Sequence, residues 1–282
     1  MKTTLLMTTY NWPQALGMVL ASVSRQTVLP DEIVIADDGS TEETKMLIEH
    51  FASNFPQPVI HVWQKDLGFR KTAILNKAIA KATGDYIIQI DGDVVLNSHF
   101  IADHIEMAQE GCFVCGSRVK ISQQETMSIL ANNKFVIKPW NMPISFVCNS
   151  FRSRLLRNYF AFRYARRLAH LRGCNMAFWK SDLIRVNGYN EDLTQWGHED
   201  TEIAYRLYYS GVQKKALKMG GIVYHLYHKE SSKANEEIHN VALEKVEKEH
   251  ITRCNNGIDK YLKNYERRES SNKYRARHFC RY

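Results

Sequence analysis

Asp91 and Asp93, two carboxylates separated by one glycine, directly follow the apolar run of residues 86–90. Hard oxygen donors at this spacing can face one pocket, and Gly92 keeps the turn between them tight. Mg²⁺ and Mn²⁺ prefer such ligands, and a cation held there would bind a diphosphate. The alternative is an ordinary acidic turn, since a bare Asp-x-Asp pattern is common. We favour the metal site because the apolar run is typical of a buried strand.

Asp38 is a further candidate, because it follows a second apolar run, residues 33–36. Its carboxylate could accept a hydrogen bond from a base N–H or a ribose hydroxyl. Asp37 is the neighbour that could instead be structural. Helix capping by Ser40 and Thr41 competes with a binding role for this turn.

Glu199 and Asp200 stand at the start of a predicted helix, just after Gly197. The helix dipole favours carboxylates at this position, which is the structural explanation. The functional explanation is a general base that takes a proton from an acceptor hydroxyl. Trp196, just before them, could stack on the face of a sugar.

His225 and His228 follow a predicted strand near the C-terminal end of the regular part of the chain. One of them could complete the coordination of a metal already held by Asp93. Residues three apart on a strand point to opposite faces, so we expect only one of the two histidines to serve. A structural role is the alternative for each.

The elements that position these side chains alternate in type along the first part of the chain. Repetition of strand and helix implies right-handed crossovers and a mainly parallel sheet, whose ligands lie at the carboxyl ends of the strands. The polar clusters of residues 8–11, 37–40 and 91–93 would all meet at that edge. The predicted strands are residues 4–7, 33–36, 59–62 and 86–90.

Local signals also predict how several elements begin and pack. Asn11 is expected to cap a helix that has Pro13 in its first turn. The helix after Gly197 is expected to turn four residues inward and to close at Gly211, and a strand pair is expected to follow. The four residues are Ile203, Ala204, Leu207 and Tyr208.

The chain has 282 residues and a net charge of +8, enough length for one large α/β domain or one domain with an appendage. The charge is local: residues 126–181 contain ten Lys and Arg and no acid, and residues 260–282 contain eight Lys and Arg and two Glu. These segments indicate a surface for an anionic partner, such as lipid headgroups, a phosphate-bearing acceptor or nucleic acid.

The six cysteines show no disulfide-scaffold pattern, and Cys112 and Cys115 would lie on opposite faces of a strand. We expect reduced core thiols. The N-terminus lacks a signal-peptide run, and no stretch approaches the ~20 apolar residues of a membrane span. The expected location is therefore cytoplasmic, with peripheral contact at the inner face of the cell membrane as an option.

Seven stretches together resemble family 2 inverting glycosyltransferases of the GT-A fold. They are most similar to the bacterial capsule-polymerase branch, which includes chondroitin polymerases and has a C-terminal half similar to the β-1,4-galactosyltransferases. The stretches occur in the family's order and span about residues 2–232. They are TTYNWP, VLPDEIVIADDGSTEET, QKDLGFRKTAILNKAI, YIIQIDGDVVL, RGCNMAFWKSDLIRVNGYNE, WGHEDTEIAYRL and YHLYHKES.

The resemblance implies a role for each candidate on the donor side. Thr8, Tyr10 and Asp38 would line the nucleotide, with Asp38 nearest the uracil or ribose. Arg70 and Lys71 would lie near the base or the diphosphate. The implied donor is a nucleotide-sugar, with UDP favoured.

The resemblance also implies the metal and catalytic residues. Asp91 and Asp93 match the family's acidic pair, with Asp93 the direct ligand of Mn²⁺ or Mg²⁺. His228 matches the late metal ligand better than His225, which stays open. Asp200 matches the catalytic base. Glu199 would contact acceptor or donor, and Trp196 would line the site.

The implied architecture is a GT-A domain over residues 1–232, with a nucleotide-sugar-binding half (1–117) and an acceptor and catalytic half (118–232). Residues 233–282 would form a helical basic extension. One departure is Cys174, where relatives often have a second glycine, and it bears on pocket shape. The implied function is transfer of a sugar to a glycan or lipid-linked acceptor in polysaccharide synthesis. Separately, the charge of the basic segments 150–172 and 260–282 makes contact with a membrane surface an option.

Three other functions compete with this one. A nucleotidyltransferase would want a glycine-rich phosphate loop near the first strand, which TTYNWP is not. A nucleic-acid-binding protein could use the basic aromatic region but would leave the aligned carboxylates unexplained, so no nucleic acid is expected. An inactive glycan-binding relative is disfavoured because every expected carboxylate is present.

In residues 151–170, arginines and aromatics do not separate cleanly at helical spacing, which weakens the prediction of a helix that lies in the membrane interface. A flap with solvated arginines is the alternative for that segment.

Overall fold

The structure is a computed structural model that describes residues 1–136, 149–163, 168, 171–229 and 236–262. In chain order its strands are β1 (Thr3–Thr9), β2 (Glu32–Asp37), β3 (Val59–Trp63), β4 (Tyr86–Asp91), β5 (Val94–Leu96), β6 (Cys112–Gly116), β7 (Val119–Lys120), β8 (Asn175–Trp179), β9 (Gln213–Leu217) and β10 (Val223–His225). Its helices are α1 (Pro13–Val23), α2 (Glu42–Asn54), α3 (Lys71–Lys81), α4 (Phe100–Met107), α5 (Gln123–Asn132), α7 (Arg154–Arg163), α8 (Lys180–Arg185), α9 (Glu199–Tyr209) and α10 (Glu236–Glu249).

A seven-stranded sheet with the order β3-β2-β1-β4-β8-β6-β9 forms the centre of the molecule. Strands β3, β2, β1 and β4 run parallel, whereas β8 is antiparallel to both of its neighbours. The expectation of a mainly parallel sheet flanked by helices is confirmed. All four strands predicted from the sequence exist, each within two residues of its expected bounds.

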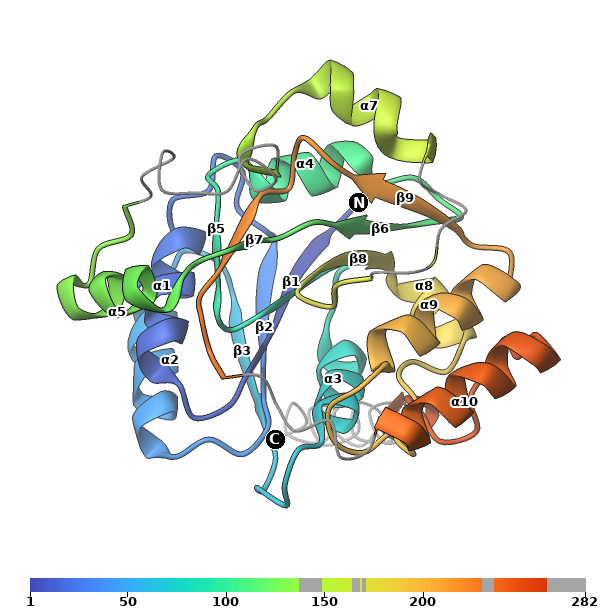
Figure 1. Cartoon of the computed structure of the whole chain (residues 1–282). Coiled ribbons are helices and arrows are strands. Elements are labelled where there is room, and N and C mark those ends of the chain that lie inside the picture. Colours follow the sequence, from blue (N-terminus) through green and yellow to red (C-terminus); the bar gives the residue numbers. More distant parts are fainter. Residues whose placement is uncertain (137–148, 164–167, 169–170, 230–235, 263–282) are drawn as a thin grey trace, which may run out of the picture.

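Helices cover both faces of this sheet, with α1 and α2 on one side and α3, α8 and α9 on the other (Figure 1). Alternation along β1 explains the two layers, because Leu5 and Met7 pack against α1 while Leu6 packs toward α3. All three side chains are fully buried, as expected for a parallel strand covered on both faces.

A second, three-stranded sheet has the order β5-β10-β7. Its central strand β10 is antiparallel to β5 and parallel to β7, and the pairing places His225 opposite Val94. The chain after β10 stays close to β4, since Leu226 N–H donates to the Asp93 carbonyl at 3.0 Å. This sheet brings the end of β10 beside the acidic pair.

Three local expectations were wrong. Asn11 does not cap α1: its Oδ1 accepts from Thr41 N–H at 2.9 Å, at the start of α2. Tyr208 does not point inward and is 43% exposed, because it falls off the stripe that packs on the core. The strands β9 and β10 are not paired, because β9 joins β6 in the large sheet and β10 joins the small one.

The chain end that the structure describes packs onto this domain. Ile258 is fully buried in the core cluster that contains α3 and α9, and the Asn187 carbonyl accepts from its N–H. The division into residues 1–117, 118–232 and 233–282 stays a prediction. Residues 263–282, which carry most of the expected basic tail, lie outside the described part.

Four described cysteines, Cys112, Cys115, Cys174 and Cys254, are free and buried, as expected for reduced core thiols. Cys148 and Cys280 lie outside the described residues. Among the helices that the structure describes, none has the length and hydropathy needed to cross a membrane.

Candidate active site

The carboxyl ends of β1, β2 and β4 border a cavity of about 670 Å³. Strand register puts Thr8 of β1 opposite Asp91 of β4, and a Cβ on Gly92 would overlap the Thr8 carbonyl. Only glycine therefore allows this approach, as the Asp-Gly-Asp turn predicted. The described lining residues include these candidates: Thr8, Tyr10, Asp38, Lys71, Asp91, Asp93, Trp196, His225 and His228.

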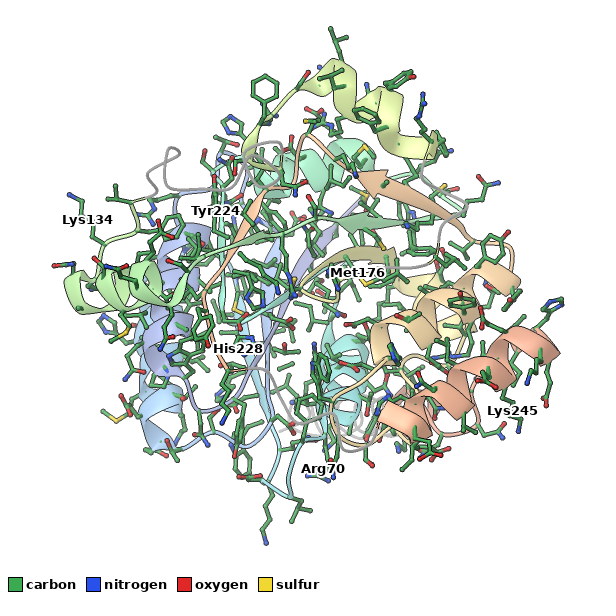
Figure 2. All side chains as sticks on the ribbon, in the orientation of Figure 1. Arg70, Lys134, Met176, Tyr224, His228 and Lys245 are labelled. Carbon is green, nitrogen blue, oxygen red and sulfur yellow. The ribbon has the colours of Figure 1, made fainter. Side chains whose placement is uncertain are left out.

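Asp93, His225 and His228 form one cluster, in which one ligand atom from each lies within 4.8 Å of the others. His225 Nε2 is 3.8 Å from Asp93 Oδ1, and His228 Nε2 is 3.3 Å from Asp93 Oδ2. The expectation that only one histidine faces Asp93 was wrong. Strand β10 ends at His225, so the alternation of a strand no longer governs His228. Figure 2 labels His228 in the lower half of the view.

Backbone carbonyls fix the orientation of both imidazoles. His225 Nδ1 is 2.9 Å from the Leu226 carbonyl, and His228 Nδ1 is 3.0 Å from the Lys229 carbonyl. A carbonyl only accepts, so each Nδ1 carries a proton, and Nε2 is the nitrogen of each ring that is left to bind a metal. Burial lowers the pKa of His225, which favours its neutral form.

Asp93 also fits a metal, because its buried Oδ1 has no hydrogen-bond partner among the described residues. Burial raises the pKa of Asp93. One carboxylate and two imidazole nitrogens suit a borderline divalent cation, with ligand distances of about 2.0–2.2 Å.

Asp91 is placed differently from the prediction, since it is not part of this cluster. Its Oδ1 accepts from Thr8 Oγ1 at 2.9 Å and pairs with Lys71 Nζ at 2.9 Å. Lys71 Nζ also lies 3.8 Å from Glu199 Oε1. Burial opposes the charge on Asp91, but the ammonium of Lys71 outweighs it and holds the pKa of Asp91 below its usual value.

Lys71 therefore joins the strand-end acid to the start of α9. Burial works against its charge, yet the surrounding carboxylates raise the pKa of Lys71 well above its usual value. The arrangement brings Asp91, Lys71 and Glu199 together from β4, α3 and α9. Asp91 and Glu199 are thus linked through Lys71, although neither Glu199 nor Asp200 is among the described cavity-lining residues.

Asp38 faces the cavity and is held by two donors. Arg70 N–H donates to Oδ2 at 2.7 Å, and Gln64 Nε2 donates to Oδ1 at 2.5 Å. Burial raises the pKa of Asp38. Asp37 is structural, because its Oδ1 accepts from Ser40 N–H at 2.7 Å and its Oδ2 lies 2.9 Å from His61 Nε2.

Arg70 contributes its backbone rather than its side chain to this region. Its guanidinium donates to the Lys65 carbonyl at 2.7 Å, and Arg70 is not among the described cavity-lining residues. Tyr10 lines the cavity, 53% exposed, and its hydroxyl donates to Asp66 at 2.9 Å. Trp196 also lines the cavity and is 39% exposed, so its ring is accessible.

Asp200 is not among the described cavity-lining residues, and Gly173 makes room for its carboxylate. A Cβ on Gly173 would overlap the Asp200 carboxylate, so only glycine fits at this position. Asp200 Oδ1 is buried and has no hydrogen-bond partner among the described residues. Burial raises the pKa of Asp200 to about 7, with Lys71 opposing the shift and Glu199 adding to it.

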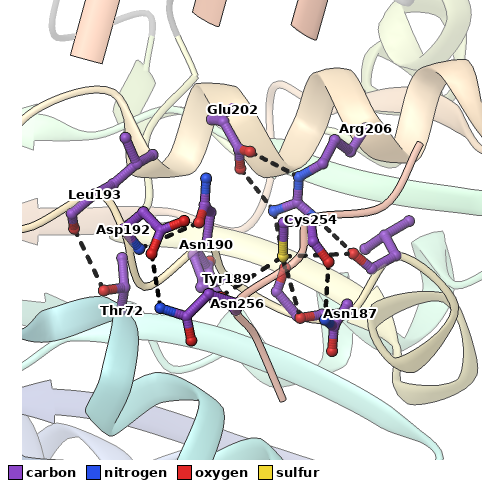
Figure 3. A network of polar contacts seen from close by, with 12 residues as sticks. Thr72, Asn187, Tyr189, Asn190, Asp192, Leu193, Glu202, Arg206, Cys254 and Asn256 are labelled. Atoms are coloured by element: carbon purple, nitrogen blue, oxygen red, sulfur yellow. Dashed lines mark hydrogen bonds and ion pairs between the residues drawn. The ribbon is translucent and has the colours of Figure 1, made fainter. Parts of the chain in front are cut away.

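A polar network fixes the loop that leads to α9 (Figure 3). Arg206 is fully buried, pairs with Glu202 at 2.6 Å, and donates to the carbonyl oxygens of Val186 and Gly188. Thr72 of α3 donates to the Leu193 carbonyl at 3.4 Å. These contacts hold the start of α9 against α3.

His239 of α10 is a residue that sequence reasoning missed. It is fully buried; its Nδ1 accepts from His198 N–H at 3.0 Å, and its Nε2 lies 3.2 Å from the Thr194 carbonyl. This pairing requires the neutral form with the proton on Nε2. A Cβ on Gly197 would overlap the His239 ring, so a residue with a side chain does not fit at this position. No local pattern marked His239, because its partners are about forty residues away.

Family comparisons fit this geometry. Residues 4–185 match the family model described as glycosyl transferase family 2, and residues 153–229 match the one described as the N-terminal domain of galactosyltransferase. Chondroitin synthase from Escherichia coli is 28% identical over 240 residues, which cover 77% of this chain and 33% of that protein. The chain thus spans about a third of the length of this relative.

Two solved structures share the fold. A mannosyltransferase from Pyrobaculum calidifontis, in complex with GDP-Man and Mn²⁺, covers 86% of this chain and 60% of its own, with a TM-score of 0.56 and 17% identity. The TarS protein of S. aureus, residues 1–349 in complex with UDP, covers 80% and 61%, with a TM-score of 0.56 and 18% identity. At such identities the likeness concerns the fold, and it confirms the expected GT-A architecture.

Proposed function

The chain belongs to glycosyl transferase family 2, and from this premise we propose that it transfers a sugar from a nucleotide-sugar to a glycan acceptor with inversion. The observation that carries the proposal is the common cavity of Asp38, Asp91 and the Asp93–His225–His228 cluster. The charges of Lys71 and Asp91, which line that cavity, act on Asp200. Family membership favours glycosyl transfer over the nucleotidyltransferase and nucleic-acid alternatives. The similarity to chondroitin synthase supports a role in polysaccharide synthesis.

Asp38 and Tyr10 are proposed to bind the nucleoside. Asp38 keeps acceptor capacity toward the cavity, since Arg70 N–H and Gln64 Nε2 each use one position on its oxygens. An exposed Tyr10 ring at the rim offers a surface for a base. UDP is the favoured nucleotide, because the TarS structure was obtained with UDP.

Asp93, His225 and His228 are proposed to hold Mn²⁺ or Mg²⁺. The Mn²⁺ complex of the mannosyltransferase supports this assignment. A bound cation would neutralise charge on the diphosphate leaving group. The buried Asp93 Oδ1 and the two oriented Nε2 atoms supply the ligands. Asp91, engaged by Lys71, is proposed to orient that lysine rather than to bind the cation directly.

Asp200 is proposed to remove the proton of the acceptor hydroxyl as that oxygen attacks the anomeric carbon. A single displacement inverts the configuration there. With its pKa near 7, Asp200 is ionised in part at neutral pH and basic enough to accept a proton. Glu199, the residue before Asp200, is proposed to contact the acceptor or donor through its carboxylate oxygens. Trp196 is proposed to stack on a sugar ring.

The proposal is tested with a panel of UDP-, GDP- and CMP-sugars, incubated with the full chain and with Mn²⁺, Mg²⁺ or a chelator. Release of nucleoside diphosphate and sugar transfer to oligosaccharides are measured together. We expect UDP-sugar turnover with Mn²⁺ and its loss on chelation. Equal turnover with the chelator, or binding of none of the sugars by calorimetry, would oppose the proposal.

His239→Ala should lower turnover while sparing donor binding. Its loss leaves His198 N–H and the Thr194 carbonyl without their partner and opens space beside Gly197, so the loop before Asp200 loosens. We expect kcat to fall about 10- to 100-fold, as for other misplaced catalytic groups. Steady-state kinetics and UDP calorimetry are the measurements.

Two variants sharpen this test. His239→Asn keeps an acceptor near the Nδ1 position and should restore part of kcat. Ile238→Ala alters an exposed neighbour on the same helix and should leave kcat unchanged. A loss of UDP affinity equal to the loss of kcat would mean that His239 only stabilises the fold.

Contact with an anionic membrane surface through α7 is the proposal for the basic segment at residues 150–172. Leu155, Tyr159 and Phe162 form an exposed stripe at helical spacing, with 84%, 60% and 50% exposure. Arg157, on the same helix, is buried and pairs with Asp103, and this ion pair attaches α7 to α4. Arg157 is therefore not solvated, contrary to the flap alternative.

Exposed cations flank this stripe, because the Arg154 side chain is 73% exposed and Arg163 lies against the Tyr159 ring. An apolar stripe with a cationic rim suits anionic lipid headgroups. The triple change Leu155→Ser, Tyr159→Ser and Phe162→Ser should lower co-sedimentation with phosphatidylglycerol vesicles about tenfold. The exposed Met46→Ser and Val241→Ser changes are the controls. Undiminished co-sedimentation of the triple variant would contradict the proposal.

A further inference from the structure

The proposed mechanism leaves two arginines unused, Arg118 and Arg172, and the strand pairing brings their segments together. Strand pairing aligns Cys115 of β6 with Met176 of β8, and Asn175 Nδ2 donates to the Ser117 carbonyl at 2.7 Å. The chain that follows Ser117 therefore runs beside the chain that precedes Asn175. This places Arg118 next to the Arg172-Gly173 segment.

Each arginine adjoins a different part of the proposed chemistry. Arg118 lines the cavity and precedes β7, which pairs with β10 at His225. Arg172 precedes Gly173, where an added Cβ would overlap the Asp200 carboxylate. A group that touches both arginines would lie next to the base and to the metal cluster together.

Neither guanidinium has an anionic partner in the part of the chain that the structure describes. No hydrogen bond or ion pair of either guanidinium occurs there, although Arg206, Arg157 and Arg152 are each paired with a carboxylate. Burial, together with the like charge of Arg118, lowers the pKa of Arg172. Two neighbouring cations repel each other, and an anionic ligand that contacts both would relieve this repulsion.

We propose that Arg118 and Arg172 form an anion subsite that recognises a carboxylate or phosphate group on the acceptor sugar. Planar guanidiniums match both anions through paired N–H donors. The subsite rests on the proposed function, because the base defines where the acceptor hydroxyl lies. The acceptor is assigned rather than the donor, since Arg172 adjoins Asp200 whereas Thr8, Asp38 and Lys71 line the donor side.

Binding of small probes to the full chain, in the presence of UDP and Mn²⁺, tests this subsite. The probes are a disaccharide that ends in a uronic acid, the methyl ester of the same disaccharide, and a disaccharide with a phosphate monoester. We expect one acidic probe to bind at least about tenfold more tightly than the neutral ester. The stronger of the two acidic probes identifies the anion as carboxylate or phosphate.

Arg118→Gln and Arg172→Gln should each reduce this preference about tenfold without changing UDP affinity. Arg172 is exposed, so Arg172→Gln is expected to fold and can still be tested if Arg118→Gln folds poorly. Arg185→Gln, which removes an exposed arginine paired with Asp182, is the matched control.

Two results would overturn the subsite. Equal affinity of the acidic and ester probes, including no binding of either, would remove the anion preference. A loss of UDP affinity in both arginine variants would assign these side chains to the donor diphosphate. Normal UDP and Mn²⁺ binding by the parent chain separates both results from failure of the proposed function.

Discussion

Asp200→Asn is expected to lower turnover by about 10²- to 10⁴-fold, the usual contribution of a general base. The change keeps the shape of the side chain and its fit against Gly173, so the fold and the cavity should persist. UDP and Mn²⁺ affinities should change little, because Asp200 is not part of the metal cluster. Calorimetry and single-turnover kinetics measure the two effects separately.

The pH profile gives this prediction a second readout. A base works in its ionised form, so activity should fall as the pH drops through the pKa of Asp200 at about 7. The profile of kcat/KM in the parent chain should therefore rise toward a plateau above pH 7. In Asp200→Asn this rise should disappear from the residual activity.

Glu199→Gln is the matched control for the neighbouring carboxylate. Burial raises the pKa of Glu199, but its Oε2 accepts from Gly197 N–H at 3.2 Å, and it faces Lys71 rather than Gly173. The rise of the profile should remain in this variant. Two results would indicate that Glu199 is the base. One is normal turnover by Asp200→Asn, and the other is a pH profile that loses its rise only in Glu199→Gln.

Asp93→Ala is expected to abolish metal dependence and donor binding together. Removing a group that only supports a metal ligand costs 10- to 100-fold in affinity, so loss of a direct ligand should cost at least about 100-fold. Paramagnetic resonance of free Mn²⁺ measures metal binding without relying on activity. Calorimetry of UDP, with and without Mn²⁺, measures the donor.

His225→Ala and His228→Ala should weaken Mn²⁺ as well, since both Nε2 atoms face Asp93. Asp85→Ala is the control, because this exposed carboxylate precedes the amino end of β4, far from the cavity edge, and accepts from Lys2 N–H. Unchanged Mn²⁺ affinity in Asp93→Ala would refute the metal assignment even if turnover fell.

The donor side of the site could be predicted from sequence because its signals are local. The apolar runs of β1, β2 and β4 are strands buried on both faces, and the residue that follows each of them must emerge at the same edge. Asp38 and Asp91 therefore needed no knowledge of distant contacts. The sequence also distinguished these two neighbours: Asp37 accepts a hydrogen bond within its own turn, whereas Asp38 faces the cavity.

The remaining features depend on contacts between distant segments. The antiparallel insertion of β8 between β4 and β6 has no marker in its own residues. The two histidines were expected on opposite faces because the end of β10 at His225 was not foreseen. His239 and Arg118 owe their positions to α10 and β7, elements whose neighbours are set only by the folded chain.

The central claim is that Asp93, His225 and His228 hold a divalent cation that faces the donor diphosphate. Anomalous diffraction at the manganese edge, from crystals grown with UDP and Mn²⁺, tests it directly. The account predicts one strong peak within about 2.0–2.2 Å of Asp93 and the two Nε2 atoms, with the diphosphate of UDP against it. A peak held elsewhere in the cavity, or bound UDP with no manganese peak at these three residues, would contradict the account.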